Sequence, residues 1–148
     1  TWCFIMDYLK VLVEEIHSVV VATVDETGHP HTAVMDMMWE DGKTVYFLTA
    51  DFKPLYKRLK EDGRVALTGM TQGAGTMDRK SISLTGQVEW IGKEHLEELL
   101  KANPYMYEIY PTEEGRSHLQ VFRFKNAVGN FYYLTQLPPY QARFEIEG

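Results

Sequence analysis

Four polar side chains near the middle of the chain could together bind a phosphate group. They are Thr49, Lys53, Lys57 and Arg58. They surround the point where an alternating segment, residues 44–50, gives way to a helical pattern that begins near Pro54. A helix N-terminus presents unpaired backbone N–H groups and the positive end of the helix dipole, which suits an anion. Asp51 is the expected N-cap. The alternative interpretation is that these cations form the solvated face of a short amphipathic helix.

Sulfur-containing and aromatic side chains follow one another on the preceding segment, which is the expected strand 32–39. They are Met35, Met37, Met38 and Trp39. Such residues form plain core in many proteins. The alternative is that a flat aromatic ligand rests on the backbone of this strand while its charged tail reaches the helix start. One cofactor would then explain both features.

Other kinds of site have little support in the sequence. The five histidines are dispersed, and His29 and His31 have no acidic residue or cysteine at a ligand spacing, so we expect no metal site. No G-x-S-x-G, GxGxxG or P-loop motif is present, and residues 73–75 predict a flexible loop. The single cysteine, Cys3, allows no intrachain disulfide framework, which favours a reducing compartment and a cytoplasmic location.

Composition limits the remaining possibilities. A chain of 148 residues with 45% hydrophobic content predicts one domain with one core. The net charge of −6 and the absence of a long basic run argue against a nucleic-acid partner. No apolar run reaches membrane-spanning length, so no membrane partner is expected. We expect residues 1–6 to be a tag or disordered N-terminus and residues 7–148 to form the single domain.

The elements that position these residues are mainly strands. We expect helices over residues 7–17, 54–61 and 93–103, and strands over residues 19–24, 32–39, 44–50, 65–70, 81–90, 119–124 and 128–135. The first three strands are predicted to form a meander, and Lys125-Asn126 to form the turn between the last two. Gly86 indicates a bulge or a close approach. Together they predict a mainly β (α+β) fold, a six- to seven-stranded antiparallel barrel with three short helices, closed so that no strand edge is left exposed.

Residues 23–70 and 81–91 carry a resemblance to a known family. The stretch TVDETGHPHTAVMDMMWEDGKTVYFLTADFKPLYKRLKEDGRVALTGM, followed by SISLTGQVEWI, resembles the FMN-binding split-barrel proteins related to pyridoxamine 5′-phosphate oxidase. It is most similar to the small bacterial branch that includes the nitroimidazole-resistance proteins. The likeness covers the chain from Asp7 to Leu134, and the order of the elements is more specific than any single motif.

The resemblance implies a homodimer with two FMN molecules in grooves between the subunits. The flavin ring would rest along Thr32, Ala33, Val34, Met35 and Asp36, and its phosphate would lie near Leu48, Thr49, Lys53, Pro54 and Lys57. Residues of the other subunit, from the end of the long strand or from segment 105–110, would close the groove. The oxidases carry a Ser-Arg-Lys run where this chain has Lys53-Pro54-Leu55, and residues 135–148 show no match to their substrate-binding residues. Oxidation of vitamin B6 is therefore not expected.

The expected activity is that of an FMN-dependent oxidoreductase, resembling a flavin reductase or a nitroreductase. It would reduce a small organic acceptor with electrons from a nicotinamide donor. The electron transfer belongs to the flavin, so no catalytic side chain is assigned. Two alternatives remain: a non-catalytic protein of the same fold that binds flavin, haem or deazaflavin, and an interaction barrel with an empty groove.

Overall fold

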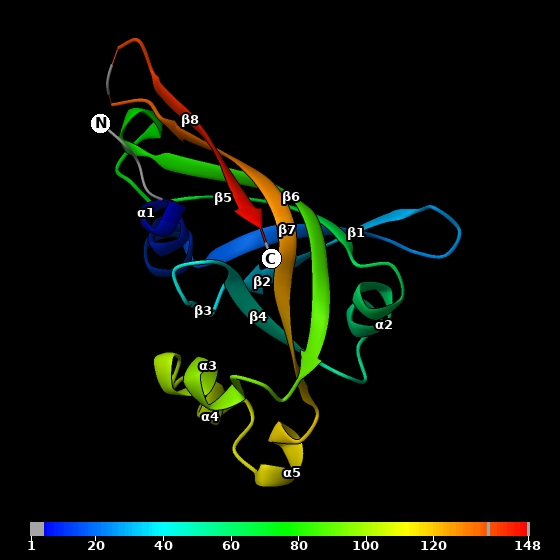
Figure 1. Cartoon of the computed structure of the whole chain (residues 1–148). Coiled ribbons are helices and arrows are strands. Elements are labelled where there is room, and N and C mark those ends of the chain that lie inside the picture. The colour runs from blue at the N-terminus through cyan, green and yellow to red at the C-terminus, as the bar shows by residue number, and fades with distance from the viewer. Residues whose placement is uncertain (1–4, 136, 148) are drawn as a thin grey trace.

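The chain folds around a single antiparallel sheet of eight strands, and the computed structural model describes residues 5–135 and 137–147. The strands are β1 (Ser18–Val24), β2 (Pro30–Asp36), β3 (Trp39–Glu40), β4 (Val45–Ala50), β5 (Arg64–Met70), β6 (Lys80–Gly92), β7 (Leu119–Tyr133) and β8 (Tyr140–Glu147). The sheet curls into a half-open barrel with the strand order β2-β1-β5-β6-β7-β4-β3, and β8 pairs with β7 (Figure 1). The predicted split barrel is confirmed.

The helices are short and lie at the ends and sides of the barrel. They are α1 (Ile5–Lys10), the π-helix η1 (Val11–Ile16), α2 (Pro54–Glu61), the 3-10 turn η2 (Thr76–Asp78), α3 (Leu96–Ala102), α4 (Met106–Ile109) and α5 (Glu113–Arg116). Helices α3, α4 and α5 lie together beyond one end of the barrel, and α2 lies beside it (Figure 1). The expectation for residues 1–4 lies outside the described residues. Among the described residues, no helix has the length and apolar character to cross a bilayer.

The predicted three-stranded meander is wrong. β2 pairs with β1, and β4 pairs with β7 and with the two-residue strand β3, so β2 and β4 are not paired with each other. Met37 and Met38 separate β2 from β3, and both side chains are buried. β2 therefore becomes one edge of the sheet, and β3 and β4 form the other. The two edges approach each other at the split of the barrel.

β4 is covered on both faces, as its alternating pattern predicted. All six of its residues are buried. Val45 and Phe47 belong to the barrel core, while Tyr46 and Leu48 belong to a second apolar cluster. That second cluster also includes Leu99, Leu100 and Met106 from α3 and α4. The strand thus connects the barrel core to the helices that cover the split.

The predicted turn at Lys125-Asn126 is also wrong, because both residues lie within β7, a continuous strand of 15 residues. Gln87 pairs with Asn126 and Val88 pairs with Phe124, so Lys125 is the extra residue of a β-bulge. A Cβ atom on Gly86 would lie 2.0 Å from the Asn126 carbonyl oxygen. The predicted close approach at Gly86 is confirmed. The turn into the final strand comes later in the chain, and β8 was not predicted.

Candidate functional site

A groove with a volume of about 250 Å³ opens at the split of the barrel. Its walls come from the end of β2, the end of β4 and helix α4. The residues that line it are Val34, Met35, Asp36, Met38, Leu48, Thr49, Ala50, Lys53, Met106, Ile109 and Tyr110. β3 pairs only with Val45 and Tyr46, so β4 has no strand partner on this side over residues 47–50. The groove therefore lies between the free edges of β2 and β4.

Thr49 brings a hydroxyl group to this groove. The residue is 4% exposed, and its side chain forms no hydrogen bond with any residue that the structure describes. Its hydroxyl is therefore available to a polar ligand in the groove.

Lys53 adds a positive charge to the same groove. Its side chain is exposed and takes part in no ion pair within residues 5–135 and 137–147. It is also the residue at the N-cap of α2, where no side chain caps the helix. The uncapped helix start and the free ammonium group lie next to each other in the chain, and both favour an anion.

Two of the expected contacts around the helix start are different in the structure. Asp51 does not cap α2, because its Oδ1 pairs with His118 Nδ1 at 2.9 Å. The carboxylate is thereby held by an imidazole and not by the helix. Arg58 turns away from the helix start, and its Nε donates to Thr23 Oγ1 at 2.8 Å. The phosphate-binding cluster predicted around Thr49 therefore does not include Arg58.

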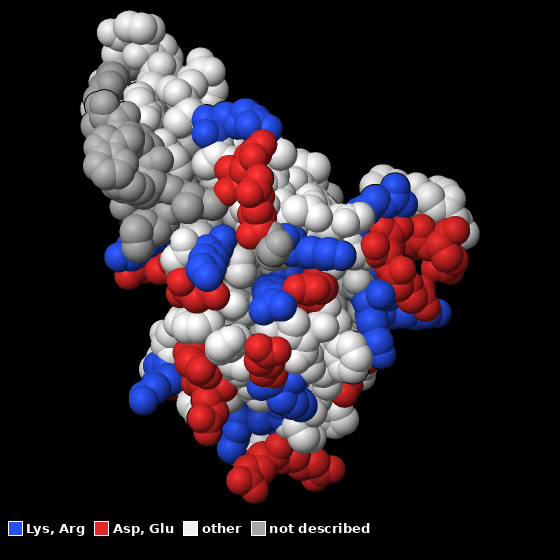
Figure 2. Space-filling view, in the orientation of Figure 1, with Lys and Arg blue, Asp and Glu red and all other residues white. Residues whose placement is uncertain are grey.

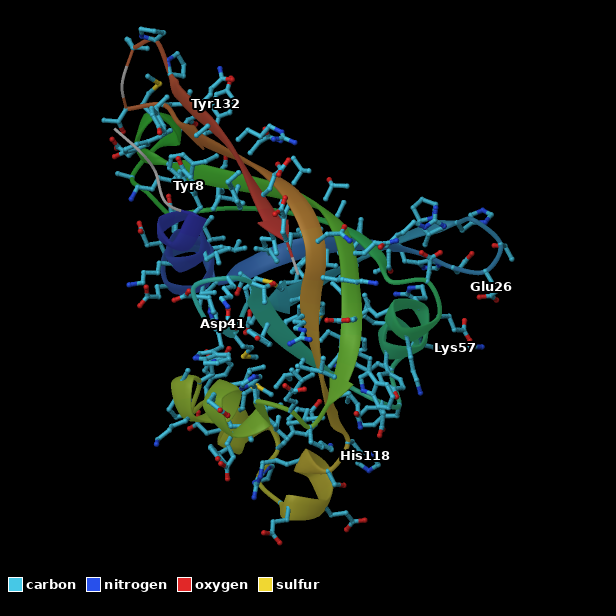
Figure 3. All side chains as sticks on the ribbon, in the orientation of Figure 1. Tyr8, Glu26, Asp41, Lys57, His118 and Tyr132 are labelled. Carbon is cyan, nitrogen blue, oxygen red and sulfur yellow. The ribbon has the colours of Figure 1, made fainter. Side chains whose placement is uncertain are left out.

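The groove brings together six of the predicted cofactor contacts: Val34, Met35, Asp36, Leu48, Thr49 and Lys53. Four others do not line it in this chain. Thr32 and Ala33 lie earlier on β2, and Pro54 is the first residue of α2. Lys57 is exposed and projects from the side of α2 that faces away from β4 (Figure 3).

Sequence reasoning missed part of the groove wall. The residues that were missed are Met38, Ala50, Met106, Ile109 and Tyr110. The last three belong to segment 105–110, which lines the groove of the same chain, whereas it was expected to come from the other subunit. Asn103 holds this segment in place, since its Nδ2 donates to the carbonyl oxygens of Met38 and Leu99, each at 2.8 Å. The only signal in the sequence was the irregular aromatic character of the segment, which indicated a wall without indicating where it packs.

A hydrogen-bond network closes the end of the groove at Asp36. Ser18 Oγ donates to Asp36 Oδ1 and Tyr105 Oη donates to Asp36 Oδ2, both at 2.7 Å. His17 Nε2 lies 2.7 Å from Tyr105 Oη. Burial, together with the neighbouring carboxylate, raises the pKa of Tyr105, so its phenol keeps its proton at neutral pH. None of these links was predicted from the sequence.

The surroundings of the groove do not suggest other kinds of site. Positive and negative side chains are interspersed over the face in Figure 2. Within the described residues, no group of three or more His, Cys, Asp or Glu side chains is arranged to hold a metal ion. The groove, which is lined by both Thr49 and the exposed Lys53, is therefore the candidate site.

A curled antiparallel sheet with a groove between its two free edges defines a protein of the split β-barrel class. The chain belongs to the pyridoxamine 5′-phosphate oxidase family, because the model of that family matches residues 5–133. The match includes every strand except β8. A search of curated proteins finds no match to the sequence.

Solved structures share this fold at low sequence identity. A NimC/NimA family protein from Clostridium acetobutylicum is 20% identical, with a TM-score of 0.73 over 95% of this chain and 88% of that one. A heme binding protein from Mycobacterium smegmatis is 13% identical, with a TM-score of 0.69 over 96% of this chain and 59% of that one. A protein described as an F420 reductase is 20% identical, with a TM-score of 0.60 over 78% of this chain and 90% of that one. Identities this low establish the fold alone.

Proposed function

We propose that this protein binds FMN in the groove at the split and acts as an oxidoreductase on a small organic acceptor. The observation that carries the proposal is that Thr49, with a hydroxyl group, and Lys53, with an ammonium group, both line a groove whose other residues are mostly apolar. A phosphate monoester carries nearly two negative charges at neutral pH. A hydroxyl donor, a lysine and an uncapped helix start supply the donors and positive charge that such a group needs.

The rest of the groove suits the flat ring system of a flavin. Met35, Met38, Leu48 and Met106 give apolar and polarizable walls, which pack well against aromatic rings. An edge strand also presents unpaired backbone N–H and C=O groups, and β2 has such a free edge at the groove. Those groups would bond the polar edge of the ring. The residues proposed to hold the cofactor include the predicted run from Thr32 to Asp36, with Pro54 next to Lys53 at the helix start. Lys57 would contribute only as a more distant positive charge on α2.

The size of the groove supports the proposal that a second copy completes it. Pockets for small ligands have volumes of about 300–1,000 Å³, and the groove of a single chain has about 250 Å³. One wall also leads directly to a surface that suits a partner. Val34 lines the groove and is nevertheless 71% exposed. A homodimer would bury this side chain and close the groove from the open side.

The outer face of the sheet next to Val34 carries no charge over five strands. One register row consists of Val34, Val20, Thr68, Ser83 and Asn130, all exposed. The adjacent row, Thr32, Ala22, Ala66, Thr85 and Val128, is also uncharged. Depletion of charge is typical of the core of a protein interface. We infer that this face packs against a second copy.

The division of labour between cofactor and protein follows from the site. When it is bound, FMN supplies the transfer of an electron pair from a nicotinamide donor to the acceptor. Thr49 and Lys53 anchor the phosphate, and the methionine walls orient the ring and exclude water from one face. Asp36 is the acidic residue of the groove wall.

Titration of the purified, dialysed protein with FMN and with riboflavin tests the proposal. We expect FMN to bind at least about tenfold more tightly, because riboflavin lacks the phosphate and one charge-assisted contact contributes about 1.5–3 kcal/mol. NADH or NADPH should then reduce the bound flavin, and a quinone should reoxidise it. Binding without reduction would favour the non-catalytic alternative, and tighter binding of haem or of a deazaflavin than of FMN would overturn the choice of cofactor.

A further inference from the structure

We propose that His17, Tyr105 and Asp36 form a proton relay that supplies protons to the groove. The relay runs from a partly exposed imidazole to a carboxylate in the groove wall. Its use in reducing an acceptor rests on the function proposed above. Its existence rests only on the contacts among the three side chains.

The direction of one hydrogen bond at His17 is fixed by its partner. His17 Nδ1 lies 3.0 Å from the carbonyl oxygen of Val13. A carbonyl oxygen accepts and cannot donate, so Nδ1 must carry a proton. The other ring nitrogen, Nε2, lies 2.7 Å from Tyr105 Oη, which in turn lies 2.7 Å from Asp36 Oδ2.

Counting protons leaves two arrangements for this chain of contacts. The phenol of Tyr105 has one proton and two close neighbours, so a second proton must occupy the other contact. Either Nε2 is protonated and donates to Tyr105, which donates to the Asp36 carboxylate, or Asp36 is protonated and donates to Tyr105, which donates to Nε2. Both arrangements hold the same number of protons. They differ only by a shift of two protons, each across a gap of 2.7 Å.

The two ends of the relay differ in whether they belong to the groove. The His17 and Asp36 side chains are similarly exposed, at 29% and 27%, but Asp36 lines the groove and His17 does not. Tyr105 lies between them and is partly buried, and its raised pKa keeps it in the neutral form that passes a proton on without holding a charge. The arrangement therefore links solvent to the groove through the protein.

No other charged side chain competes for these three groups within the described residues. Ser18 Oγ donates to Asp36 Oδ1 at 2.7 Å, and Met38 Sδ lies 3.5 Å from Tyr105 Oη. On η1, next to His17 in the chain, Glu15 is engaged with Lys80 at 2.9 Å. Asp36 and His17 are 3.6 Å apart and are the only ionisable partners of Tyr105 among residues 5–135 and 137–147.

The backbone at His17 also indicates a fixed position. Its φ and ψ angles are 63° and −64°, a positive-φ conformation outside the αL region that costs a non-glycine residue about 1–3 kcal/mol. The conformation is held by the His17 carbonyl oxygen, which accepts from the Met37 amide at 2.7 Å. Glycine would adopt this backbone without strain. The presence of an imidazole here places Nε2 within reach of Tyr105.

Reduction of a quinone to a hydroquinone takes up an electron pair and two protons in total. The relay supplies one of these two protons. Bound flavin, once reduced, would supply the electron pair and one proton, as a hydride equivalent. The second proton passes from Asp36 to the quinone oxygen as Tyr105 protonates Asp36 and His17 Nε2 protonates Tyr105. The quinone becomes a hydroquinone, His17 becomes neutral, and solvent then returns one proton to Nε2.

Nitrogen and carboxyl NMR of the unliganded protein tests the relay without any activity. With labelled histidine and aspartate, we expect three protons on the His17 ring, Tyr105 and Asp36 together near neutral pH. Tyr105→Phe should reduce the number on His17 and Asp36, whereas Tyr107→Phe, an exposed position on the same helix, should not. A wild-type protein with one proton on the His17 ring and an ionised Asp36 would overturn the relay.

Stopped-flow kinetics then tests its use. The NADPH-reduced protein is mixed anaerobically with menadione, and we expect Tyr105→Phe to slow reoxidation about 100-fold, the lower range for a general acid. His17→Asn should do the same, because it removes the imidazole that donates to Tyr105. Reduction by NADPH and the rates of Tyr107→Phe should match the wild type. Reoxidation of Tyr105→Phe at the wild-type rate, or an equal loss in both half-reactions, would overturn the inference. If no flavin is bound or reduced, the proposed function fails while the NMR result stands.

Discussion

Replacement of Lys53 by alanine should weaken FMN without affecting riboflavin. Lys53 is the cation that lines the groove, and it has no ion-pair partner among the residues that the structure describes, so a phosphate would be its first anionic contact. A charge-assisted hydrogen bond contributes about 1.5–3 kcal/mol. Because the side chain is exposed, solvent screening favours the lower value. We therefore expect an increase in Kd of about tenfold for FMN.

Fluorescence titrations with both ligands separate a phosphate contact from a general effect of charge. Riboflavin shares the ring of FMN, so its affinity for Lys53→Ala should equal that for the wild type. Lys57→Ala removes the same charge from the outer side of α2, and we expect a smaller loss there. Thr49→Val, which keeps the shape and removes the hydroxyl, should also lower only the FMN affinity. If Lys53→Ala leaves the Kd of FMN unchanged, or if riboflavin weakens equally, the placement of the phosphate is wrong.

Three further predictions concern assembly and stability. Val34→Glu should convert a dimer into a monomer, measured by light scattering after size exclusion, because it places a charge on the uncharged face. Gly86→Ala should lower the free energy of unfolding by about 3 kcal/mol or more, and the Tm by about 6–12 °C, because the new Cβ would lie 2.0 Å from the Asn126 carbonyl oxygen. Burial and the hydrogen bond to Asp41 raise the pKa of Tyr46 from its ordinary value of 10.0 to about 12. Since the unfolded chain loses this proton first, stability should fall as the pH rises from about 10 to about 12, and Tyr46→Phe should lose less stability over that range in thermal melts.

Each of these predictions has a matched control. Gly75→Ala adds a Cβ that meets nothing within 4 Å, so it should leave the Tm nearly unchanged. Met77→Glu places a charge at a half-exposed apolar position on η2, outside the two uncharged rows, and should leave the dimer intact. Tyr107→Phe should melt like the wild type at high pH. A control that behaves like its test variant would contradict the local explanation in each case.

The sequence was sufficient for the elements that have a strong period and clear ends. β4 and α2 lie where alternation and Pro54 placed them, and the chain folds into the expected split barrel. Thr49 and Lys53 were found because a strand end and a helix start lie next to each other in the chain. Local pattern alone decides both positions, so no knowledge of the remaining topology was needed.

The errors occurred where partners distant in sequence decide the outcome. Asp51 is a residue type that commonly caps helices, but its carboxylate pairs with the imidazole of His118, 67 positions away in the chain. Lys125 and Asn126 have the composition of a turn, but the neighbouring β6 accommodates Lys125 as a bulge. The relay has the same origin, since Tyr105 and Asp36 are 69 positions apart. Spacing along the chain contains no signal for such contacts.

The break in the sheet explains why the proposed binding site and the proposed interface adjoin each other. Two buried methionines interrupt the strand that would otherwise have continued from β2, so the barrel does not close and both β2 and β4 keep free edges. Free edges with unpaired backbone groups favour association unless something covers them. The polar edge of a flavin ring would cover some of the unpaired backbone groups at the split. A second copy of the sheet would cover others. Val34 borders both the groove and the uncharged face. A completely closed barrel would have neither the groove nor the free strand edges that favour the proposed dimer.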